Sequence, residues 1–220
     1  MVLIFDLDDT LYDENAFVKS GFKAVARYVS GVTGISEKKL YLRELRLLAL
    51  YGRGKIFNTL LEEHSVLTHK NVRKCLSIYR KHRPNIALYP GVRDLLKELS
   101  CYSRLYLVTE GNTLVQTAKI RALGIRHFFN KIYITNRYGP KAAKPALYCF
   151  EKIKRLEKCN WSDVVYIGDD PNKDFVALNR VGACTVRVHS GRFATTKAKQ
   201  FHGARYNIKD IGKFTTSILS

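Results

Sequence analysis

The chain has 220 residues, 46% of them hydrophobic, and its 38 lysines and arginines against 19 aspartates and glutamates give a formal net charge of +19. No apolar run approaches the ~18 residues of a membrane helix, and no basic segment precedes a cleavable apolar stretch. We therefore expect neither a membrane span nor a signal peptide. The five cysteines form no CxxC pair, which favours buried free thiols in a reducing cytoplasm.

The positive charge attracts anions, whether nucleic acid, anionic lipid or a phosphorylated metabolite. Basic residues are spread through the whole chain rather than gathered in one tail, which argues against a dedicated nucleic-acid arm. Nucleic acid is thus a partner that the charge allows but does not favour.

The chain begins with an apolar stretch, Val2-Leu3-Ile4-Phe5. Its composition and lack of helical period predict a strand buried on both faces, as in a parallel sheet. The strand delivers Asp6 and Asp8 to the carboxyl edge of that sheet, which is where open α/β sheets bind ligands. We therefore take Asp6 as the chemical centre.

Residues 14–88 carry several helical patterns and almost no strand pattern. Apolar residues recur at helical spacing in four segments, with breaks at Gly34, Gly52 and Pro84, and Ser36 is a suitable cap. The stretch is predicted to be a helical insertion that forms a small bundle.

Residues 89–220 alternate between strand and helix patterns, which indicates right-handed βαβ units and a parallel sheet covered on both faces. We expect helices that begin at Lys144 and near Asp174, and a terminal helix around Ile211, Phe214 and Ile218. The class is thus α/β with a doubly wound parallel sheet, a core domain of 1–13 and 89–220, and an inserted domain of 14–88. The predicted strands are 105–108, 131–134, 164–167, 184–188 and 206–208.

Polar residues follow the predicted strands at one edge of the sheet. Five carboxylates gathered there would repel one another unless a cation neutralised them, and carboxylate oxygens favour a hard ion such as Mg²⁺. The histidines form no cluster with ligand spacing, so none is assigned to a metal. The residues at this edge are Asp6, Asp8, Thr109, Lys144, Asp169, Asp170 and Asp174.

These motifs closely resemble the phosphatases of the haloacid dehalogenase (HAD) superfamily, over essentially the whole chain. The resemblance implies a HAD-like Rossmannoid core and places a helical type 1 cap at residues 14–88. The matching motifs are Asp6-Leu7-Asp8-Asp9-Thr10, Thr109 after an apolar strand, Lys144-Pro145, and Gly168-Asp169-Asp170 with Asp174.

The resemblance implies that Asp6 attacks phosphorus and forms an aspartyl-phosphate, which water then hydrolyses. Asp8, two positions further along a path that bends, can reach the leaving oxygen and suits a general acid that then becomes a base. Mg²⁺ would be held by Asp6, the Asp8 carbonyl and Asp169, with Asp174 acting through water and Asp170 in support.

Thr109 and Lys144 would hold the phosphoryl oxygens. Glu110 and Gly111 follow Thr109, and Glu110 stands where the family more often has Asn, so it would lie beside the substrate. Lys141 is an alternative to Lys144, although Lys144-Pro145 fits the motif better. In the cap, Arg53-Gly54-Lys55 could read a second anionic group or could be a solvated helix connection.

The expected substrate is a small phosphorylated metabolite such as a sugar phosphate or nucleotide, and the protein is expected to be a monomer or homodimer. A phosphomutase would use the same intermediate and stays open as an alternative. A receiver domain has no place for the fourth-strand Gly-Asp-Asp or for the helical insertion. A nucleic-acid binder on this fold is the third alternative, motivated by the charge.

Overall fold

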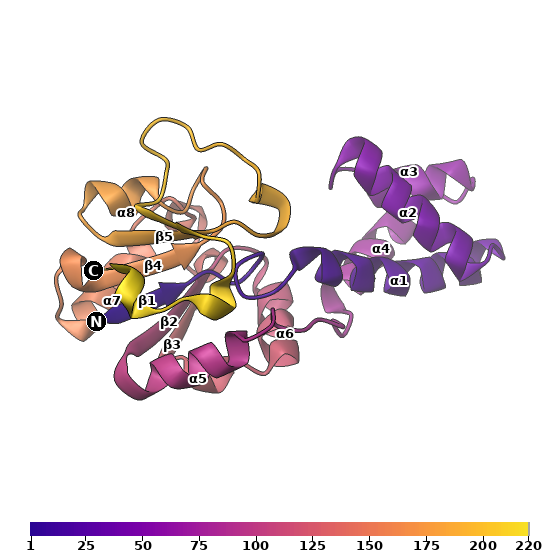
Figure 1. Ribbon diagram of the computed structural model, residues 1–220. Helices are drawn as coiled ribbons and strands as arrows, with labels where there is room; N and C mark the ends of the chain where they lie inside the picture. Colours follow the sequence, from indigo (N-terminus) through magenta and orange to yellow (C-terminus); the bar gives the residue numbers. More distant parts are fainter. Residues whose placement is uncertain (220) are drawn as a thin grey trace. The chain divides into compact units, whose positions relative to one another are not determined.

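The computed structural model describes residues 1–219 and divides the chain into two compact units (Figure 1). The core unit comprises Met1–Glu14 together with the chain from Ile86 onward, and the helical unit comprises Asn15–Asn85. Within residues 1–219, no helix combines the length and the apolar character that crossing a membrane requires.

A six-stranded parallel sheet forms the centre of the core unit, in the order β3-β2-β1-β4-β5-β6. Figure 1 labels the first five of these strands. In β1, Leu3 lies opposite Leu105 of β2 on one side and Val165 of β4 on the other. The predicted doubly wound parallel sheet is confirmed, with the first strand in its middle. The strands are β1 Val2–Phe5, β2 Arg104–Thr109, β3 Lys131–Ile134, β4 Val164–Gly168, β5 Cys184–Val188 and β6 Tyr206–Ile208.

Both faces of β1 are buried, because successive side chains of a strand point to opposite faces. Val2 and Ile4 belong to a core cluster with Phe150 and Leu178. Phe5, on the other face, has its ring centroid 6.2 Å from that of Phe129. Polar groups brought by β1 can therefore meet solvent only at the edge of the sheet. The α-helices of this unit are α5 Val92–Tyr102, α6 Thr113–Leu123, α7 Tyr148–Glu157 and α8 Val176–Arg180.

The helical unit contains the four predicted helices around its own apolar core. The hydroxyls of Ser36 and Thr68 accept hydrogen bonds from the first turns of the second and fourth helices, which satisfies amide groups that lack helical partners. A Cβ on Gly21 would lie 2.5 Å from the Tyr79 ring, so this helix crossing requires glycine. The helices are α1 Glu14–Thr33, α2 Glu37–Tyr51, α3 Ile56–Glu63 and α4 His69–Lys81.

The remaining elements are short 3-10 turns. Two of them lie where a terminal helix was predicted, so that prediction was wrong. Phe214 adopts an extended conformation between the turns Ile211–Lys213 and Thr216–Leu219, so no continuous helix forms there. Ile211 and Phe214 are buried as expected, whereas the side chain of Ile218 lies outside the described ones. The other 3-10 turns are Arg126–Phe128, Thr135–Tyr138, Pro140–Ala142, Trp161–Asp163 and Gly191–Phe193.

Two further expectations were wrong. Lys144 does not begin a helix, because a residue before proline is disfavoured in the α conformation and α7 starts only at Tyr148. The helix expected near Asp174 is present as α8, although it starts two residues later, at Val176. Cys101 is exposed at the end of α5, whereas Cys75 and Cys149 are buried.

Candidate active site

Three carboxylates meet at the carboxyl edge of the sheet. Asp6 directly follows β1, Asp169 directly follows β4, and Asp174 lies in the turn after Asp169. Because β1 and β4 are neighbouring parallel strands, their ends deliver these side chains to one point. One carboxylate oxygen from each residue lies within 4.8 Å of the others, and all three residues are buried. The predicted meeting of Asp6, Asp169 and Asp174 is therefore present.

The ammonium group of Lys144 lies inside this cluster. Its Nζ donates to Asp6 Oδ1 at 2.9 Å, to Asp174 Oδ1 at 2.7 Å and to the Tyr166 hydroxyl at 3.0 Å. These contacts use all three ammonium protons. Burial lowers the pKa of Lys144, but the two carboxylates more than offset this and hold it well above its ordinary value. Lys141 is exposed, so Lys144 is the lysine that the structure brings to the site.

Burial makes this cluster electrostatically costly. It raises the pKa of Asp6 to about 7, a rise that Lys144 opposes and Asp174 increases. It also raises the pKa of Asp169 to about 9, with Asp6 and Asp174 adding to the effect. Both shifts have the cause expected for carboxyl groups taken from water and placed beside like charge.

Asp174 is fully engaged by protein donors. Its Oδ1 accepts from Lys144 and, at 3.0 Å, from the Tyr166 hydroxyl, and its Oδ2 accepts from the backbone N–H of Asp170 at 2.9 Å. The Asp170 carboxylate turns back onto its own loop and accepts from the Asn172 backbone and side chain, both at 2.9 Å. Asp170 therefore shapes the loop that carries Asp169 and Asp174.

Asp8 lies beside helix α6 and is held by three donors. Its Oδ1 accepts from the Tyr12 hydroxyl at 2.5 Å and from Lys119 Nζ at 2.7 Å. Its Oδ2 accepts from Gln116 Nε2 at 2.9 Å. The same Gln116 nitrogen donates to Thr109 Oγ1 at 2.6 Å. Asp8 and Thr109 are thereby joined through one side chain.

Glu110 supports Lys144 in this structure. Its Oε2 accepts a 2.9 Å hydrogen bond from the Lys144 backbone N–H, which holds the loop before α7 against the end of β2. The backbone N–H of Gly111 donates to Asn136 Oδ1 at 3.3 Å. Both predicted residues thus lie at the sheet edge, and each has a protein partner there.

Asp9 closes the loop after β1. It has a positive φ of 53°, a conformation that aspartate tolerates better than most residues. Its carboxylate accepts from the backbone N–H groups of Glu14 at 2.9 Å and Arg192 at 3.0 Å. Its carbonyl accepts from the Ser190 hydroxyl. The segment after β5 therefore braces the loop that carries Asp8.

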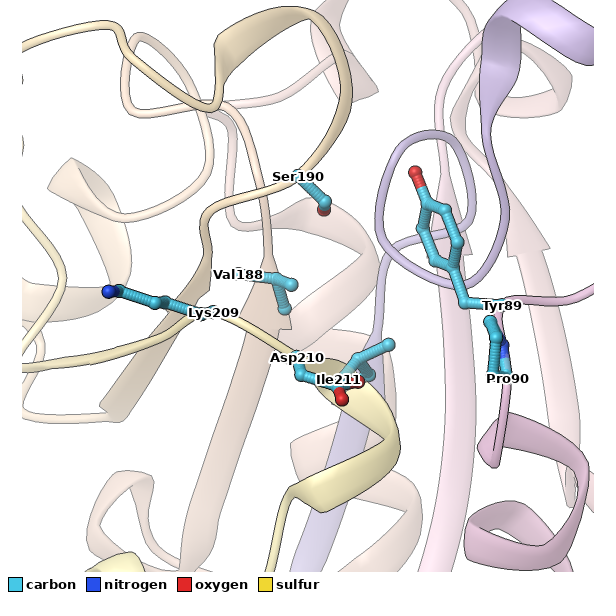
Figure 2. Close-up of a pocket in the computed structure, with 7 residues that line it drawn as sticks. All are labelled: Tyr89, Pro90, Val188, Ser190, Lys209, Asp210 and Ile211. Carbon is cyan, nitrogen blue, oxygen red and sulfur yellow. The ribbon is translucent and has the colours of Figure 1, made fainter.

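A pocket of about 200 Å³ lies beside this loop. Figure 2 shows Tyr89 and Pro90 on one side of it and Ser190 and Val188 on the other, while the Lys209 side chain points away. None of the clustered carboxylates lines this pocket. It is therefore distinct from the position at which Asp6 would react.

The predicted cap residues Arg53 and Lys55 lie in the loop between α2 and α3, and both are exposed. Their part in binding stays a prediction. The basic residues after β5 are also exposed; they are Arg192, Lys197, Lys199, Arg205, Lys209 and Lys213.

The sequence reasoning missed four residues of this site: Tyr12, Gln116, Lys119 and Tyr166. A signal was present for two of them. Gln116 and Lys119 are three residues apart on α6, so they share one face of the helix, and that face is buried. Polar side chains on the buried face of a helix require partners, and the partners are Asp8 and Thr109.

The residues present fit a divalent cation. No protein donor among residues 1–219 contacts the Asp169 carboxylate, although Asp169 is only 4% exposed, and a buried carboxylate without a donor is costly. One oxygen from each of the three carboxylates lies within 4.8 Å of the others, and Mg²⁺ binds through carboxylate oxygens. Both oxygens of Asp174 already accept from protein donors, whereas Asp169 has no such donor among residues 1–219; the role of each carboxylate toward a metal stays a prediction.

The chain is similar to named phosphatases in sequence and to HAD hydrolases in fold. Glyceraldehyde 3-phosphate phosphatase of Methanopyrus kandleri is 28% identical over 200 residues, which cover 87% of this chain and 84% of that protein. A HAD-superfamily hydrolase of Geobacter sulfurreducens has a similar fold, with a TM-score of 0.69 at 15% identity over 96% of this chain and 93% of that one.

The magnesium-bound HAD hydrolase YfnB of Bacillus subtilis also shares the fold, with a TM-score of 0.65 at 21% identity over 96% of this chain and 94% of that one. Residues 3–188 match the sequence profile of haloacid dehalogenase-like hydrolases, and this match includes every residue of the carboxylate cluster. The chain therefore belongs to the haloacid dehalogenase-like hydrolase family.

Proposed function

We propose that this protein is a magnesium-dependent phosphatase that hydrolyses a small phosphate monoester through an aspartyl-phosphate on Asp6. The observation that carries the proposal is the buried cluster of Asp6, Asp169 and Asp174 with Lys144 bonded to two of its members. Relatives in three methanogenic archaea that are named glyceraldehyde 3-phosphate phosphatase support the same reaction class.

In the first step, Asp6 attacks the phosphorus atom of the substrate. Lys144 orients the Asp6 carboxylate through Oδ1, and one oxygen of this carboxylate is the attacking atom. A bond forms between this oxygen and phosphorus while the ester P–O bond breaks, and Asp8, which enters this step in its protonated form, gives that proton to the leaving oxygen. Protonating that oxygen matters because an unassisted alkoxide is a poor leaving group, and general acids contribute about 10²–10⁴-fold.

In the second step, water attacks the phosphorus atom of the aspartyl-phosphate. Asp8, now a carboxylate, takes a proton from this water. The bond between phosphorus and Asp6 breaks, and inorganic phosphate and the Asp6 carboxylate are regenerated. One residue thereby serves as acid and then as base.

Asp6, the Asp8 carbonyl and Asp169, with Asp174 acting through water, would hold Mg²⁺, and its charge would offset the repulsion between an attacking carboxylate and a phosphate dianion. The raised pKa values of Asp6 and Asp169 support this assignment, because their buried carboxylates need positive charge to stay ionised.

Thr109 would hold a phosphoryl oxygen by a hydrogen bond, and Lys144 would attract the phosphoryl oxygens through its charge. Thr109 Oγ1 accepts from Gln116, so its own proton is available for donation to a phosphoryl oxygen. Lys144 supplies positive charge beside the nucleophile and keeps Asp6 oriented. Glu110 positions Lys144 by accepting a hydrogen bond from its backbone N–H. Gly111, in the same turn, leaves space for the Gln116 side chain.

We propose a triose phosphate as the first substrate to test, on the strength of the named relatives. The helical unit would serve as the cap and read the leaving group, with Arg53 and Lys55 meeting an anionic substituent. Arg53→Ala should then raise KM for an anionic substrate more than for p-nitrophenyl phosphate. Equal effects on both substrates would rule out recognition of an anionic substituent by Arg53.

The experiment for the reaction class measures inorganic phosphate released from a panel of phosphate monoesters, with and without Mg²⁺. Glyceraldehyde 3-phosphate, glucose 1-phosphate and p-nitrophenyl phosphate suffice as a first panel, with the Asp6→Asn protein as control. Release of free phosphate supports a phosphatase, whereas conversion of glucose 1-phosphate to an isomer would favour the phosphomutase. The cytoplasmic location and the monomeric or homodimeric state stay predictions.

A further inference from the structure

Helix α6 presents two buried polar side chains to Asp8. Lys119 Nζ lies 2.7 Å from Asp8 Oδ1 and Gln116 Nε2 lies 2.9 Å from Asp8 Oδ2. Gln116 is 1% exposed and Lys119 is 2% exposed. Each of the two carboxylate oxygens therefore has its own donor from the same helix.

A buried ammonium group requires compensation, because removing it from water is strongly unfavourable. Lys119 has Asp8 at 2.7 Å and Glu14 Oε1 at 3.4 Å, so its charge lies between two carboxylates. An apolar side chain would pack at this position without that cost. The contacts with Asp8 and Glu14 thus help to offset the cost of a lysine inside the unit.

Gln116 joins two residues of the proposed machinery. The two hydrogens of its amide nitrogen go to Thr109 Oγ1 at 2.6 Å and to Asp8 Oδ2 at 2.9 Å. A Cβ on Gly111 would lie only 3.3 Å from the Gln116 side chain. Because glycine has no side chain, the turn after β2 leaves space for the Gln116 amide. Gln116 therefore fixes the directions of the Thr109 hydroxyl and the Asp8 carboxyl together.

We propose that Gln116 and Lys119 are positioning residues that hold the Asp8 carboxyl group in the orientation required for proton transfer at the leaving oxygen. The proposal rests on the phosphatase function proposed above. Neither residue touches the reacting atoms. Both act by restricting Asp8 to one rotamer, and preorganisation of this kind places a catalytic group at its reacting distance before the substrate arrives.

The test compares a substrate that needs protonation of its leaving oxygen with one that does not. An alkyl phosphate, such as glycerol 3-phosphate, leaves as an alcohol and needs the proton, whereas p-nitrophenyl phosphate leaves as a stable phenolate. The parameter is kcat/KM, because it reports the steps up to transfer of the phosphoryl group to Asp6. The variants are Gln116→Met and Lys119→Met, which keep an unbranched side chain and remove the donors.

We expect each variant to lose about 100-fold in kcat/KM for the alkyl phosphate and less than about tenfold for p-nitrophenyl phosphate. Asp8→Asn gives the upper limit of this discrimination. Arg121→Met is the matched control, since Arg121 is exposed on the same helix, and it should change neither value. Circular dichroism checks that each variant is folded.

An equal loss with both substrates in folded Gln116→Met and Lys119→Met proteins would overturn the positioning role while leaving the proposed phosphatase intact. If Lys119→Met does not fold, Gln116→Met and Tyr12→Phe decide, because Tyr12→Phe removes only the third donor to Asp8. Absence of turnover by the unaltered protein with both substrates would overturn the proposed function and the positioning role together.

Discussion

The Glu110 carboxylate accepts a 2.9 Å hydrogen bond from the backbone N–H of Lys144, a residue 34 positions away in the chain. The bond joins the loop after β2 to the loop before α7, and Lys144 reaches Asp6 from the second of these loops. The position of the ammonium group beside the nucleophile therefore depends on a carboxylate in a different loop.

Glu110→Ala should lower the free energy of unfolding by about 2 kcal/mol, since it removes a charged acceptor from a partly buried N–H group. Glu110→Gln keeps an acceptor oxygen and should lose less than Glu110→Ala. Urea denaturation of both variants measures the difference. Equal stabilities of the two variants would show that the bond to Lys144 contributes little.

Glu44 in α2 should make the helical unit sensitive to pH. Its side chain is fully buried, and neither carboxylate oxygen has a hydrogen-bond partner. Burial raises its pKa from 4.5 to about 9. Between these two values the folded state binds a proton that the unfolded state releases, so stability falls as pH rises, by about 1.4 kcal/mol per pH unit at most.

Urea titrations followed by circular dichroism at pH 5.5 and pH 8.5 would measure this slope. Glu44→Gln should flatten it, and Glu44→Leu should flatten it and raise stability at pH 8.5. Glu62→Gln is the control, because Glu62 is exposed in the same unit. A slope that is unchanged by Glu44→Gln would contradict the assignment.

Gly191 should be intolerant of a side chain. Its φ is +58°, and a Cβ would lie 2.0 Å from the Asp9 carboxyl carbon. Gly191→Ala should therefore displace the loop that carries Asp8, lower phosphatase activity and cost at least ~2 kcal/mol. Gly182→Ala is the matched control, because its φ is +88° with no atom within 4 Å. Similar losses in stability and activity for both variants would rule out the clash with Asp9.

Magnesium binding should be visible without turnover. Mg²⁺ at about 100 times its Kd should stabilise the folded protein by about 2.7 kcal/mol, seen as a higher Tm by calorimetry, and EDTA should reverse the shift. Asp169→Asn should remove the shift. Without metal and above about pH 9, Asp169→Asn should be more stable than the unaltered protein, because it removes a buried carboxylate that lacks a protein donor. A full Mg²⁺ shift in Asp169→Asn would exclude Asp169 as a ligand.

The parts of the site that the sequence predicted are those encoded by local pattern. An apolar strand followed by Asp6, and another followed by Asp169, can be recognised because a parallel sheet brings strand ends together. The membership of the family, expected from the same motifs, is confirmed.

The parts that the sequence did not predict depend on packing between distant segments. Lys119 and Gln116 become partners of Asp8 only because α6 lies against the loop after β1. Lys144 was expected at the start of a helix. It lies instead in the loop before α7, and Glu110 holds this loop by a hydrogen bond to the Lys144 backbone N–H. No local pattern distinguishes a buried lysine from a solvated one before its partner is known.

The most direct test of the account is to locate the phosphoryl group on the enzyme. Asp8→Asn protein is mixed with p-nitrophenyl phosphate and Mg²⁺, quenched in acid and digested, and the peptide containing Asp6 is analysed by mass spectrometry. The account predicts one phosphoryl group on Asp6, formed with release of p-nitrophenolate and hydrolysed slowly. If the Asp6 peptide carries no phosphoryl group while p-nitrophenolate continues to be released, or if Asp6→Asn is fully active, the account is contradicted.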